Sequence, residues 1–248
     1  MTTEHPSLTG QQEASDFVRA IEYDGFTIID NVIGVDVINE ILNDLESIRT
    51  DAAISQRAGK AFGIRNLLNV LPSARAIANS PRLISLARPI LGDGARVVRG
   101  IYFDKNQTAN WKVAWHQDLT IAVRRQADVD GYVSWSIRAG IPHVQPPFSV
   151  LERMLTIRLH LDDTDEFNGA LHVLPGSHKC GRLEAKAIQE WREKREPVIC
   201  PVAKGGVMLM RPLLLHASSQ SLHPTNRRVL HFEYSSFNLP NELEWYDT

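Results

Sequence analysis

The stretch ARVVRGIYFDKNQTANWKVAWHQDLT, residues 95–120, is where the sequence changes from helical patterns to short β-rich runs. It holds two such runs, RVVRGIYF and WKVAWH, which are rich in β-branched and aromatic residues and are separated by a polar turn segment. Further runs follow, separated by Gly, Pro, Asn and Asp residues: RMLTIRLHL (153–161), ALHVL (170–174), VMLMRPLLLH (207–216) and RVLHFEYSSF (228–237). Several short strands in succession predict a β-sandwich or barrel.

The helical patterns lie mainly before this point. Phe17 and Ile21 recur at helical spacing ahead of the stop signal Asp24-Gly25, which predicts an amphipathic helix. Similar reasoning predicts a strand at FTIIDNVI (26–33) and two more helices, at 35–49 and 81–91. The fold class expected from this order is mainly β with N-terminal helices.

The length of 248 residues favours one domain with elaborations. We expect a single domain over 1–248, in which a helical support region at 1–94 precedes a core at 95–240. Residues 119–152 show little regular pattern over more than 25 residues, and connections of that length are usually functional. The aromatic residues and prolines within this stretch favour an ordered lid loop.

The composition excludes several classes of protein. With 43% apolar residues, 23% charged residues and a net charge of -2, the chain is ordinary for a soluble protein, and no basic patch argues for a nucleic-acid partner. No apolar run suits a signal peptide or a membrane span, so we expect a cytoplasmic monomer or homodimer with no membrane partner. Only Cys180 and Cys200 are present, which predicts reduced thiols. The common hydrolase and nucleotide-binding motifs are missing.

One strand run ends with a histidine and an aspartate two residues apart. On an extended strand residues i and i+2 point to the same side, so His116 and Asp118 can face one point while Gln117 faces away. A histidine nitrogen and a carboxylate are two of the three ligands in the facial triad that holds non-haem Fe(II) with open positions. The pair also fits an ordinary polar strand end, so a third ligand has to decide between the two interpretations.

The best candidate for the third ligand is His216, which ends the apolar run GGVMLMRPLLLH. The alternative is a strand-end histidine that bonds to a backbone carbonyl. Arg227, eleven residues further on, opens the next strand and is expected to lie antiparallel beside His216. A buried guanidinium is costly unless a carboxylate meets it, and a dicarboxylate co-substrate would supply that partner.

Together these residues resemble the phytanoyl-CoA dioxygenase family of Fe(II)- and 2-oxoglutarate-dependent oxygenases. The likeness rests on the HxD strand, on His216 followed by Ser218, on Arg227 beyond them and on NGALHVLPGSH (168–178) between. It extends over 16–237, and the leader FVRAIEYDGFTIIDNVI is similar to the usual start of the family. The resemblance implies a double-stranded β-helix, a cupin-like jelly roll, as the catalytic core.

The resemblance also implies roles for individual positions. His116, Asp118 and His216 match the iron ligands, which are the catalytic residues. Arg227 matches the residue that pairs with the distal carboxylate of 2-oxoglutarate, and Ser218 matches its hydroxyl neighbour.

Arg228 competes with Arg227 for the role in binding 2-oxoglutarate. Strand alternation puts Arg227 on the face of His231 and Glu233, and Arg228 on the face of Phe232. We prefer Arg227 because of its spacing from the histidine. A register slip of one residue would reverse this choice.

Three further cations are candidates for the same pocket. Lys105 and Arg65 fall where the family contacts its co-substrate, although a solvated surface charge fits each equally well. Arg158 shares one face of its strand with Thr156 and His160. That face either lines the barrel mouth, near 2-oxoglutarate or substrate, or is the solvent side of the strand. The family often carries an aromatic residue near Arg158, so the detail of the pocket stays open.

Other histidines and lid residues receive different roles. His172 and His178 are not assigned to the metal, because the family uses their segment as a structural strand and turn. His178 is expected to make a turn hydrogen bond. Trp135, Arg138 and His143 of the lid loop are expected to contact the substrate.

The activity implied by the resemblance uses Fe(II), 2-oxoglutarate and O2 to hydroxylate a small-molecule metabolite and releases succinate. Related halogenases replace the carboxylate ligand by a small residue, so Asp118 favours hydroxylation or desaturation. Two alternatives stay open: a non-catalytic jelly-roll ligand-binding protein, and a cupin-type metalloenzyme, for which no HxH strand motif is found. A CoA ester would need basic residues near the pocket, and Arg124-Arg125 and EWREKRE (190–196) are candidates.

Overall fold

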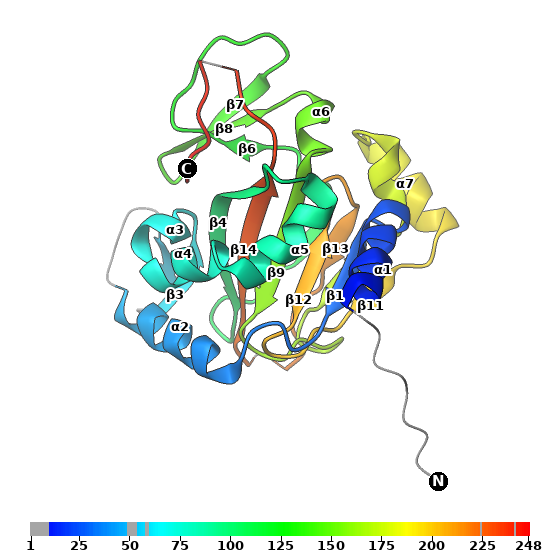
Figure 1. Ribbon diagram of the computed structural model, residues 1–248. Helices are drawn as coiled ribbons and strands as arrows, with labels where there is room; N and C mark the ends of the chain where they lie inside the picture. The colour runs from blue at the N-terminus through cyan, green and yellow to red at the C-terminus, as the bar shows by residue number, and fades with distance from the viewer. Residues whose placement is uncertain (1–9, 49–53, 58–59, 224, 241) are drawn as a thin grey trace.

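The computed structural model of the chain describes residues 10–48, 54–57, 60–223, 225–240 and 242–248. Its strands form three antiparallel sheets, and helices cover one side of the largest sheet (Figure 1). The helices in the described part of the chain are α1 (Gly10–Tyr23), α2 (Val35–Ser47), α3 (Leu67–Val70), α4 (Pro72–Ala78), α5 (Pro81–Leu91), α6 (Phe148–Leu151), α7 (Ala185–Lys194) and the 3-10 helix η1 (Ser177–Cys180).

The main sheet has seven strands, and every pairing in it is antiparallel. In spatial order these strands are β1 (Phe26–Ile29), β12 (Val207–Met210), β9 (Met154–His160), β14 (Arg227–Ser235), β4 (Arg96–Lys105), β3 (Lys60–Ile64) and β2 (Ile54–Arg57). The longest strands, β4 and β14, pair with each other over most of their length and occupy the middle of the sheet.

Two smaller sheets complete the β structure. The second sheet has the order β11 (Val198–Cys200), β10 (Leu171–Val173), β13 (His216–Ser218) and β5 (Val113–His116). The third has the order β6 (Ile121–Ala122), β8 (Ile141–Gln145) and β7 (Val133–Arg138). Buried apolar residues of β10 and β12 share one cluster, so the second sheet packs face to face on the main sheet.

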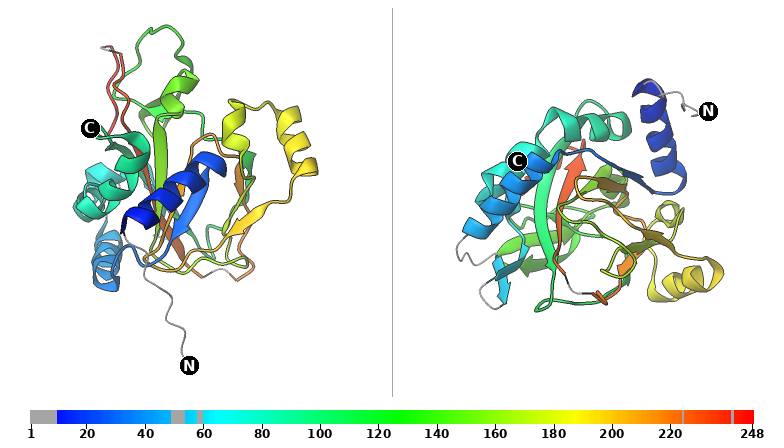
Figure 2. Two further views of the ribbon diagram at one scale, coloured as in Figure 1. Left: turned by 45° about the vertical axis from the view of Figure 1, so that its right-hand side comes forward. Right: turned by 90° about the horizontal axis from the view of Figure 1, so that it is seen from below.

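Both faces of the main sheet are buried, but one face carries apolar side chains and the other carries polar ones. On one face, Leu155, Ile157 and Leu159 of β9 join the apolar cluster beneath the helices. In the view from below, the early helices lie along this side of the sheet (Figure 2). The opposite face of β9 carries Arg158 and His160, which are also buried. The polar face of β9 is therefore interior to the protein and is not a solvent side.

The sequence-based helices agree with the structure. The helix expected before Asp24-Gly25 is α1, and the helix expected over 81–91 is α5, with Ser80 accepting a hydrogen bond from the backbone N–H of Leu83 at its start. The helix expected over 35–49 is α2, which ends at Ser47, and Arg49 lies outside the described residues.

The run VMLMRPLLLH was predicted as one strand ending at His216, and this was wrong. Its first four residues form β12 in the main sheet, whereas His216 starts β13 in the second sheet. Between them Arg211 donates its backbone N–H to Gly25 and Pro212 has no N–H to donate, so the ladder is interrupted and the chain crosses between sheets. A continuous apolar run hides this crossing because both strands are buried.

The expectation of an irregular lid loop at 119–152 was also wrong, because this region contains β6, β7, β8 and α6. β7 and β8 form a hairpin whose two connecting residues, Ala139 and Gly140, both have positive φ. A bulge between Val133 and Ser136 shifts the register of β7. These irregular positions mask the strand alternation in the sequence. A lid function of the region stays a prediction.

Two further findings bear on the expected class of protein. No helix among the described residues is both long and apolar enough to cross a bilayer. Cys180 is exposed, Cys200 is buried, and neither forms a disulfide. The second finding agrees with the expected free thiols.

Candidate metal centre

The end of β5 and the start of β13 bring two histidines and an aspartate together. His216 is directly opposite His116 in the antiparallel pairing of these strands, and their ring centroids are 4.2 Å apart. The two carboxylate oxygens of Asp118 lie 3.6 Å from Nε2 of His116 and 3.7 Å from Nε2 of His216. One ligand atom from each of the three residues lies within 4.8 Å of the others. Two nitrogens and one oxygen so arranged can bind one metal ion.

Backbone hydrogen bonds hold this arrangement in place. Asp118 donates its backbone N–H to the carbonyl of Pro212, which ties the residue after β5 to the segment before β13. Gln117 points away, as the alternation predicted, and its amide nitrogen donates to the carbonyls of Gly181 and Leu213. The intervening residue therefore anchors the HxD segment while its neighbours face the metal position.

Both histidines present the same ring nitrogen to the metal position. Nδ1 of His116 donates to the carbonyl of Ala114 at 2.8 Å, and Nδ1 of His216 donates to that of Leu214 at 2.9 Å. In a neutral imidazole such a bond places the proton on Nδ1 and leaves the lone pair on Nε2, which is the form that binds a metal. The carbonyl-bonded histidine, which was the alternative for His216, is thus also the orientation that a ligand needs.

The electrostatics of the three residues favour an ionised carboxylate. Burial opposes the charge of Asp118, but His216 and His116 outweigh it and hold the pKa of this carboxyl well below its usual range. Burial lowers the pKa of His216 to about 4, so its imidazole is neutral near pH 7. An anionic carboxylate and a neutral imidazole are the protonation states required for metal binding.

Three cations are buried on the inner face of the main sheet. They are Lys105 of β4, Arg158 of β9 and Arg227 of β14. Burial and the neighbouring arginines lower the pKa of Lys105 to about 7, and burial and Arg158 lower that of Arg227 to about 9. Burial lowers the pKa of Arg158 to about 10. This part of the interior is strongly positive and favours an anionic ligand.

The predicted hydroxyl neighbour takes part in this cluster. Lys105 donates from Nζ to Oγ of Ser218 and to the carbonyl of Ser219, both at 2.6 Å. Ser218 in turn donates to the carbonyl of Gly169, which also accepts from Arg227 at 2.8 Å. The structure thus brings Lys105, Ser218 and Arg227 together, and Lys105 is not the solvated surface charge that the sequence left open.

The position expected for Arg227 beside His216 was wrong. Arg227 lies on β14 and pairs with Lys105 of β4 in the main sheet, whereas His216 lies in the second sheet. The two residues thus come from facing sheets, because the chain changes sheets between β13 and β14. Arg228 points to the other face, where its guanidinium bonds both carboxylate oxygens of Asp162 at 2.7 and 2.8 Å.

A second group of buried polar residues lies further along β14, and it includes His231 and Glu233, to which sequence reasoning assigned no role. Arg158 donates to Nδ1 of His231 at 2.9 Å, and Nε2 of His231 lies 3.7 Å from Glu233. Glu233 also accepts a hydrogen bond from Arg99 of β4 at 3.2 Å. Strand alternation on β14 had already placed His231 and Glu233 on the same face as Arg227. This shared face was the feature of the sequence from which their burial near the site could have been predicted.

Three of the remaining predicted residues lie on the third sheet, and the fourth, Arg65, follows β3 of the main sheet. His143 of β8 is fully buried, Trp135 is half-buried and Arg138 is exposed at the end of β7. Arg65, between β3 and α3, is half-buried. Burial and the charges of Arg99 and Arg138 lower its pKa, which groups it with those arginines and not with the cations around Ser218.

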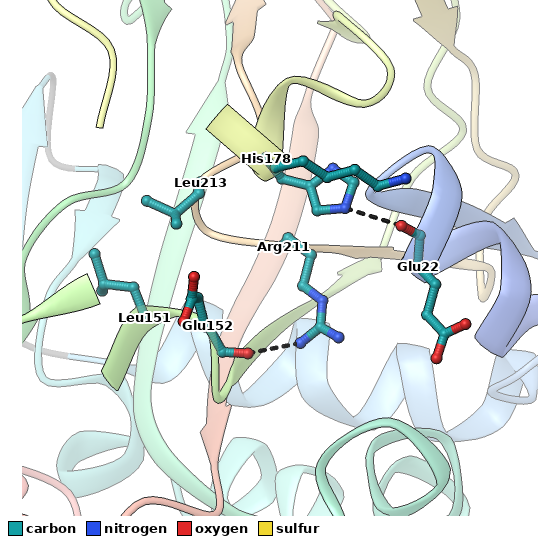
Figure 3. Close-up of a pocket in the computed structure, with 7 residues that line it drawn as sticks. Glu22, Leu151, Glu152, His178, Arg211 and Leu213 are labelled. Carbon is teal, nitrogen blue, oxygen red and sulfur yellow. Dashed lines mark hydrogen bonds between the residues drawn. The ribbon is translucent and has the colours of Figure 1, made fainter. Parts of the chain in front are cut away.

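His178 lies outside the metal centre. Its Nε2 bonds to the backbone carbonyl of Glu22 at 3.2 Å, at the edge of a pocket of about 250 Å³ that Arg211 also lines (Figure 3). The ring packs against Gly25, so the histidine joins η1 to the end of α1. This agrees with the expected turn hydrogen bond. His172, half-buried on β10, is also absent from the metal-binding group among the described residues.

Most of the chain matches the model of a known protein family. The family model described as phytanoyl-CoA dioxygenase matches residues 21–229. This span contains His116, Asp118, His216 and Arg227.

Two relatives illustrate the range of the similarity. An ectoine dioxygenase of Streptomyces coelicolor is 25% identical over 185 residues, which are 70% of this chain and 54% of the relative. A probable alpha-ketoglutarate-dependent hypophosphite dioxygenase of Stutzerimonas stutzeri is 24% identical over 246 residues, with 86% and 75% covered. The chain spans about half the length of the ectoine dioxygenases that it matches.

Solved structures share the fold. The crystal structure of EctD from S. alaskensis with 2-oxoglutarate and 5-hydroxyectoine superimposes with a TM-score of 0.67 at 20% identity, covering 95% of this chain and 78% of that one. AviO1 from Streptomyces viridochromogenes gives a TM-score of 0.66 at 20% identity, covering 92% and 96%. At these identities the likeness establishes the fold alone.

Proposed function

Because the chain belongs to the phytanoyl-CoA dioxygenase family, we propose that it is an Fe(II)- and 2-oxoglutarate-dependent dioxygenase that hydroxylates a small-molecule metabolite. The observation that carries the proposal is the convergence of His116, Asp118 and His216 opposite a cluster of buried cations. Relatives named as ectoine and hypophosphite dioxygenases support a small-molecule substrate.

The proposed iron ligands are Nε2 of His116, a carboxylate oxygen of Asp118 and Nε2 of His216. Their chemistry fits Fe(II), because two imidazoles and one carboxylate leave three positions of an octahedral ion for other ligands. With 2-oxoglutarate and O2 bound, the iron would supply the oxidising chemistry. The chain's part is to fix the ligand geometry and to keep a carboxylate at Asp118, which leaves no room for a halide ligand and favours hydroxylation.

The buried cations fit 2-oxoglutarate. The side-chain Nε atoms of Arg227 and Arg158 are buried and have no hydrogen-bond partner among the described residues. Leaving such donors unpaired is costly, and a carboxylate placed between them would satisfy both. We assign the distal carboxylate of 2-oxoglutarate to Arg227, with Ser218 and Lys105 beside it. Arg65, which lies with a different group of arginines, is the weakest of the predicted co-substrate contacts.

The proposed architecture is one domain over 1–248 with a jelly-roll core. Two four-stranded groups, β12-β9-β14-β4 and β11-β10-β13-β5, face each other. In chain order their strands alternate between the two groups, except that β10 and β11 are consecutive and pair within the second group. This order supports a double-stranded β-helix. The N-terminal helices cover the outer face of the main sheet, which leaves the inner face for the site.

An anaerobic titration tests the proposal directly. Fe(II) and 2-oxoglutarate added together to the protein should produce a weak visible charge-transfer band, and admission of air with a substrate should release succinate. No band, together with no succinate over a broad panel of metabolites, would sink the oxygenase assignment. A band without succinate over that panel would instead favour a ligand-binding protein of the same fold.

A further inference from the structure

We propose that Arg99, Glu233 and His143 form the substrate subsite of this enzyme, and that it binds a small organic acid carrying an amine or hydroxyl group. This inference rests on the proposed function and adds a class of substrate to it. The three residues come from β4, β14 and β8, so the main sheet and the third sheet build the subsite jointly.

The first observation is a set of unsatisfied polar atoms. Nε of Arg99, Oε2 of Glu233 and Nε2 of His143 are buried and have no hydrogen-bond partner in the described part of the chain. All three side chains are almost fully buried. Buried polar groups are normally paired, so three unpaired atoms in one region indicate a polar ligand.

Mutual electrostatic effects show that the three residues are neighbours. The hydrogen bond of Arg99 to Glu233 joins β4 to β14. Burial lowers the pKa of His143 to about 4, and the charge of Arg99 contributes to the shift while that of Glu233 opposes it. The third sheet stands over the end of β14, which brings β8 toward these residues (Figure 1).

The subsite also lies beside the metal centre. Burial and, to a smaller extent, the charge of Asp118 act to raise the pKa of Glu233, but Arg99 and His231 outweigh them and lower it. His231 contacts Glu233 and its charge in turn acts on Asp118. A molecule held by Glu233 would therefore be close to the iron, on the side away from Ser218 and Arg227.

Positive charge around the subsite selects an acidic ligand. Arg65 and Arg138 lie close enough to repel each other, and Arg65 is repelled by Arg99 as well. Among the described residues, the only ion pair made by any of these three arginines is that of Arg99 with Glu233. Asp247, which is near Arg99, is already engaged by the backbone N–H of Gly100. A carboxylate of the substrate would supply the missing partner.

The unpaired atoms of the subsite indicate which hydrogen-bonding groups the ligand carries besides its carboxylate. Nδ1 of His143 donates to the carbonyl of Ile141, so its Nε2 is an acceptor. Oε2 of Glu233 is a second acceptor, and Nε of Arg99 is a donor. The complementary ligand has an acidic group for the arginines and an N–H or O–H donor for the two acceptors. Amino acids and hydroxy acids have both.

Thermal shifts and the visible band test the subsite separately from the proposed function. The probes are α-amino acids and α-hydroxy acids, each paired with its methyl ester, added anaerobically to protein loaded with Fe(II) and 2-oxoglutarate. At least one free acid should raise the melting temperature and perturb the band, and its ester should do neither. Failure of the band to form speaks against the proposed function, whereas an intact band with no response to any acid, or an equal response to esters, overturns the subsite.

Amino-acid substitutions test whether the acid that responds in this assay binds at the proposed subsite. His143→Gln and the double variant Arg99→Gln/Glu233→Gln, which removes both partners of the buried pair, should weaken the binding of the responding acid at least tenfold and keep the Fe(II)–2-oxoglutarate band. Arg124→Gln is the matched control, because Arg124 pairs with Glu244 on the surface near the third sheet. Unchanged affinity for the acid in the folded double variant or in His143→Gln, or an equal loss in the control, would overturn the assignment.

Discussion

His216 lies directly opposite His116 where β13 pairs with β5, and their ring centroids are 4.2 Å apart. Strand pairing thus sets the separation of the two imidazoles. The hydrogen bond from the backbone N–H of Asp118 to the carbonyl of Pro212 fixes the backbone that carries the carboxylate beside them. The backbone defines the metal position before any ion binds, which is the preorganisation that an efficient site requires.

Removing any one of the three proposed ligands should abolish iron-dependent turnover. His116→Ala, Asp118→Ala and His216→Ala each leave two ligands, which are too few to hold Fe(II) firmly. Iron content and the anaerobic visible band measure the loss. His172→Ala is the control, since His172 is half-buried on β10 outside the triad. Full iron affinity and activity in Asp118→Ala would refute the ligand assignment.

The two adjacent arginines should behave differently. Arg227→Ala should weaken 2-oxoglutarate binding by at least tenfold, because its guanidinium is buried with an unpaired Nε. Arg228→Ala should leave that affinity nearly unchanged and cost about 1 kcal/mol of stability through the lost pair with Asp162. Titration of 2-oxoglutarate against the visible band gives the affinities. The reverse ranking would place the wrong arginine in the site.

Binding of 2-oxoglutarate should weaken as the pH rises above about 7. Burial, Arg227 and Arg158 lower the pKa of Lys105 from 10.5 to about 7, so the ligand-free protein loses this charge above neutrality. Binding a dianion must then restore the proton, and the Kd should increase by up to about tenfold per pH unit. Titrations at several pH values measure the slope. Lys105→Met should bind more weakly with a flatter profile, and an equal slope in both proteins would contradict the role of Lys105.

The effect of Lys105 on stability has the opposite sign. Because its folded pKa lies below the unfolded value, the charged side chain destabilises the fold fully below about pH 7. That penalty is relieved as the pH rises from about 7 toward 10.5. Thermal melts over this range therefore separate the effect of Lys105 on folding from its effect on ligand binding.

Gly205→Ala should destabilise the protein by about 2 kcal/mol, because a positive φ is unfavourable for alanine. Gly205 has a φ of 80°, and an added Cβ would collide with the carbonyl oxygen of Ile33. Thermal or denaturant unfolding measures the change. Gly34→Ala is the matched control, since its φ is -66° and nothing lies near its Cβ position. Equal stabilities of the two variants would contradict this account.

His178→Ala should lower the melting temperature and spare the metal centre. The ring packs on Gly25 and bonds to the carbonyl of Glu22, which joins η1 to α1. The variant should therefore unfold at a lower temperature while it retains the Fe(II)–2-oxoglutarate band. Loss of the band in a folded variant would show that the histidine does more than hold these two elements together.

Local patterns predicted well those features that depend on neighbouring residues. The helix α5 begins at Pro81, as expected, because a proline in the first turn and a capping Ser80 act within a few residues. Alternation also separated Arg227 from Arg228 correctly, because it follows from the period of an extended strand. The hairpin of β7 and β8 was missed because Ala139 adopts a positive φ that alanine rarely takes.

By itself the sequence predicted that His116 and Asp118 face one point, that His216 is their partner, and which residues of β14 share a face. Each of these predictions follows from chain geometry over a few residues or from a family resemblance. Only the tertiary structure decided that β12 and β13 belong to different sheets, that Arg227 and His216 lie in different sheets, and that Arg99 pairs with Glu233 between β4 and β14. These relationships depend on contacts between residues far apart in the chain, which local periodicity does not encode.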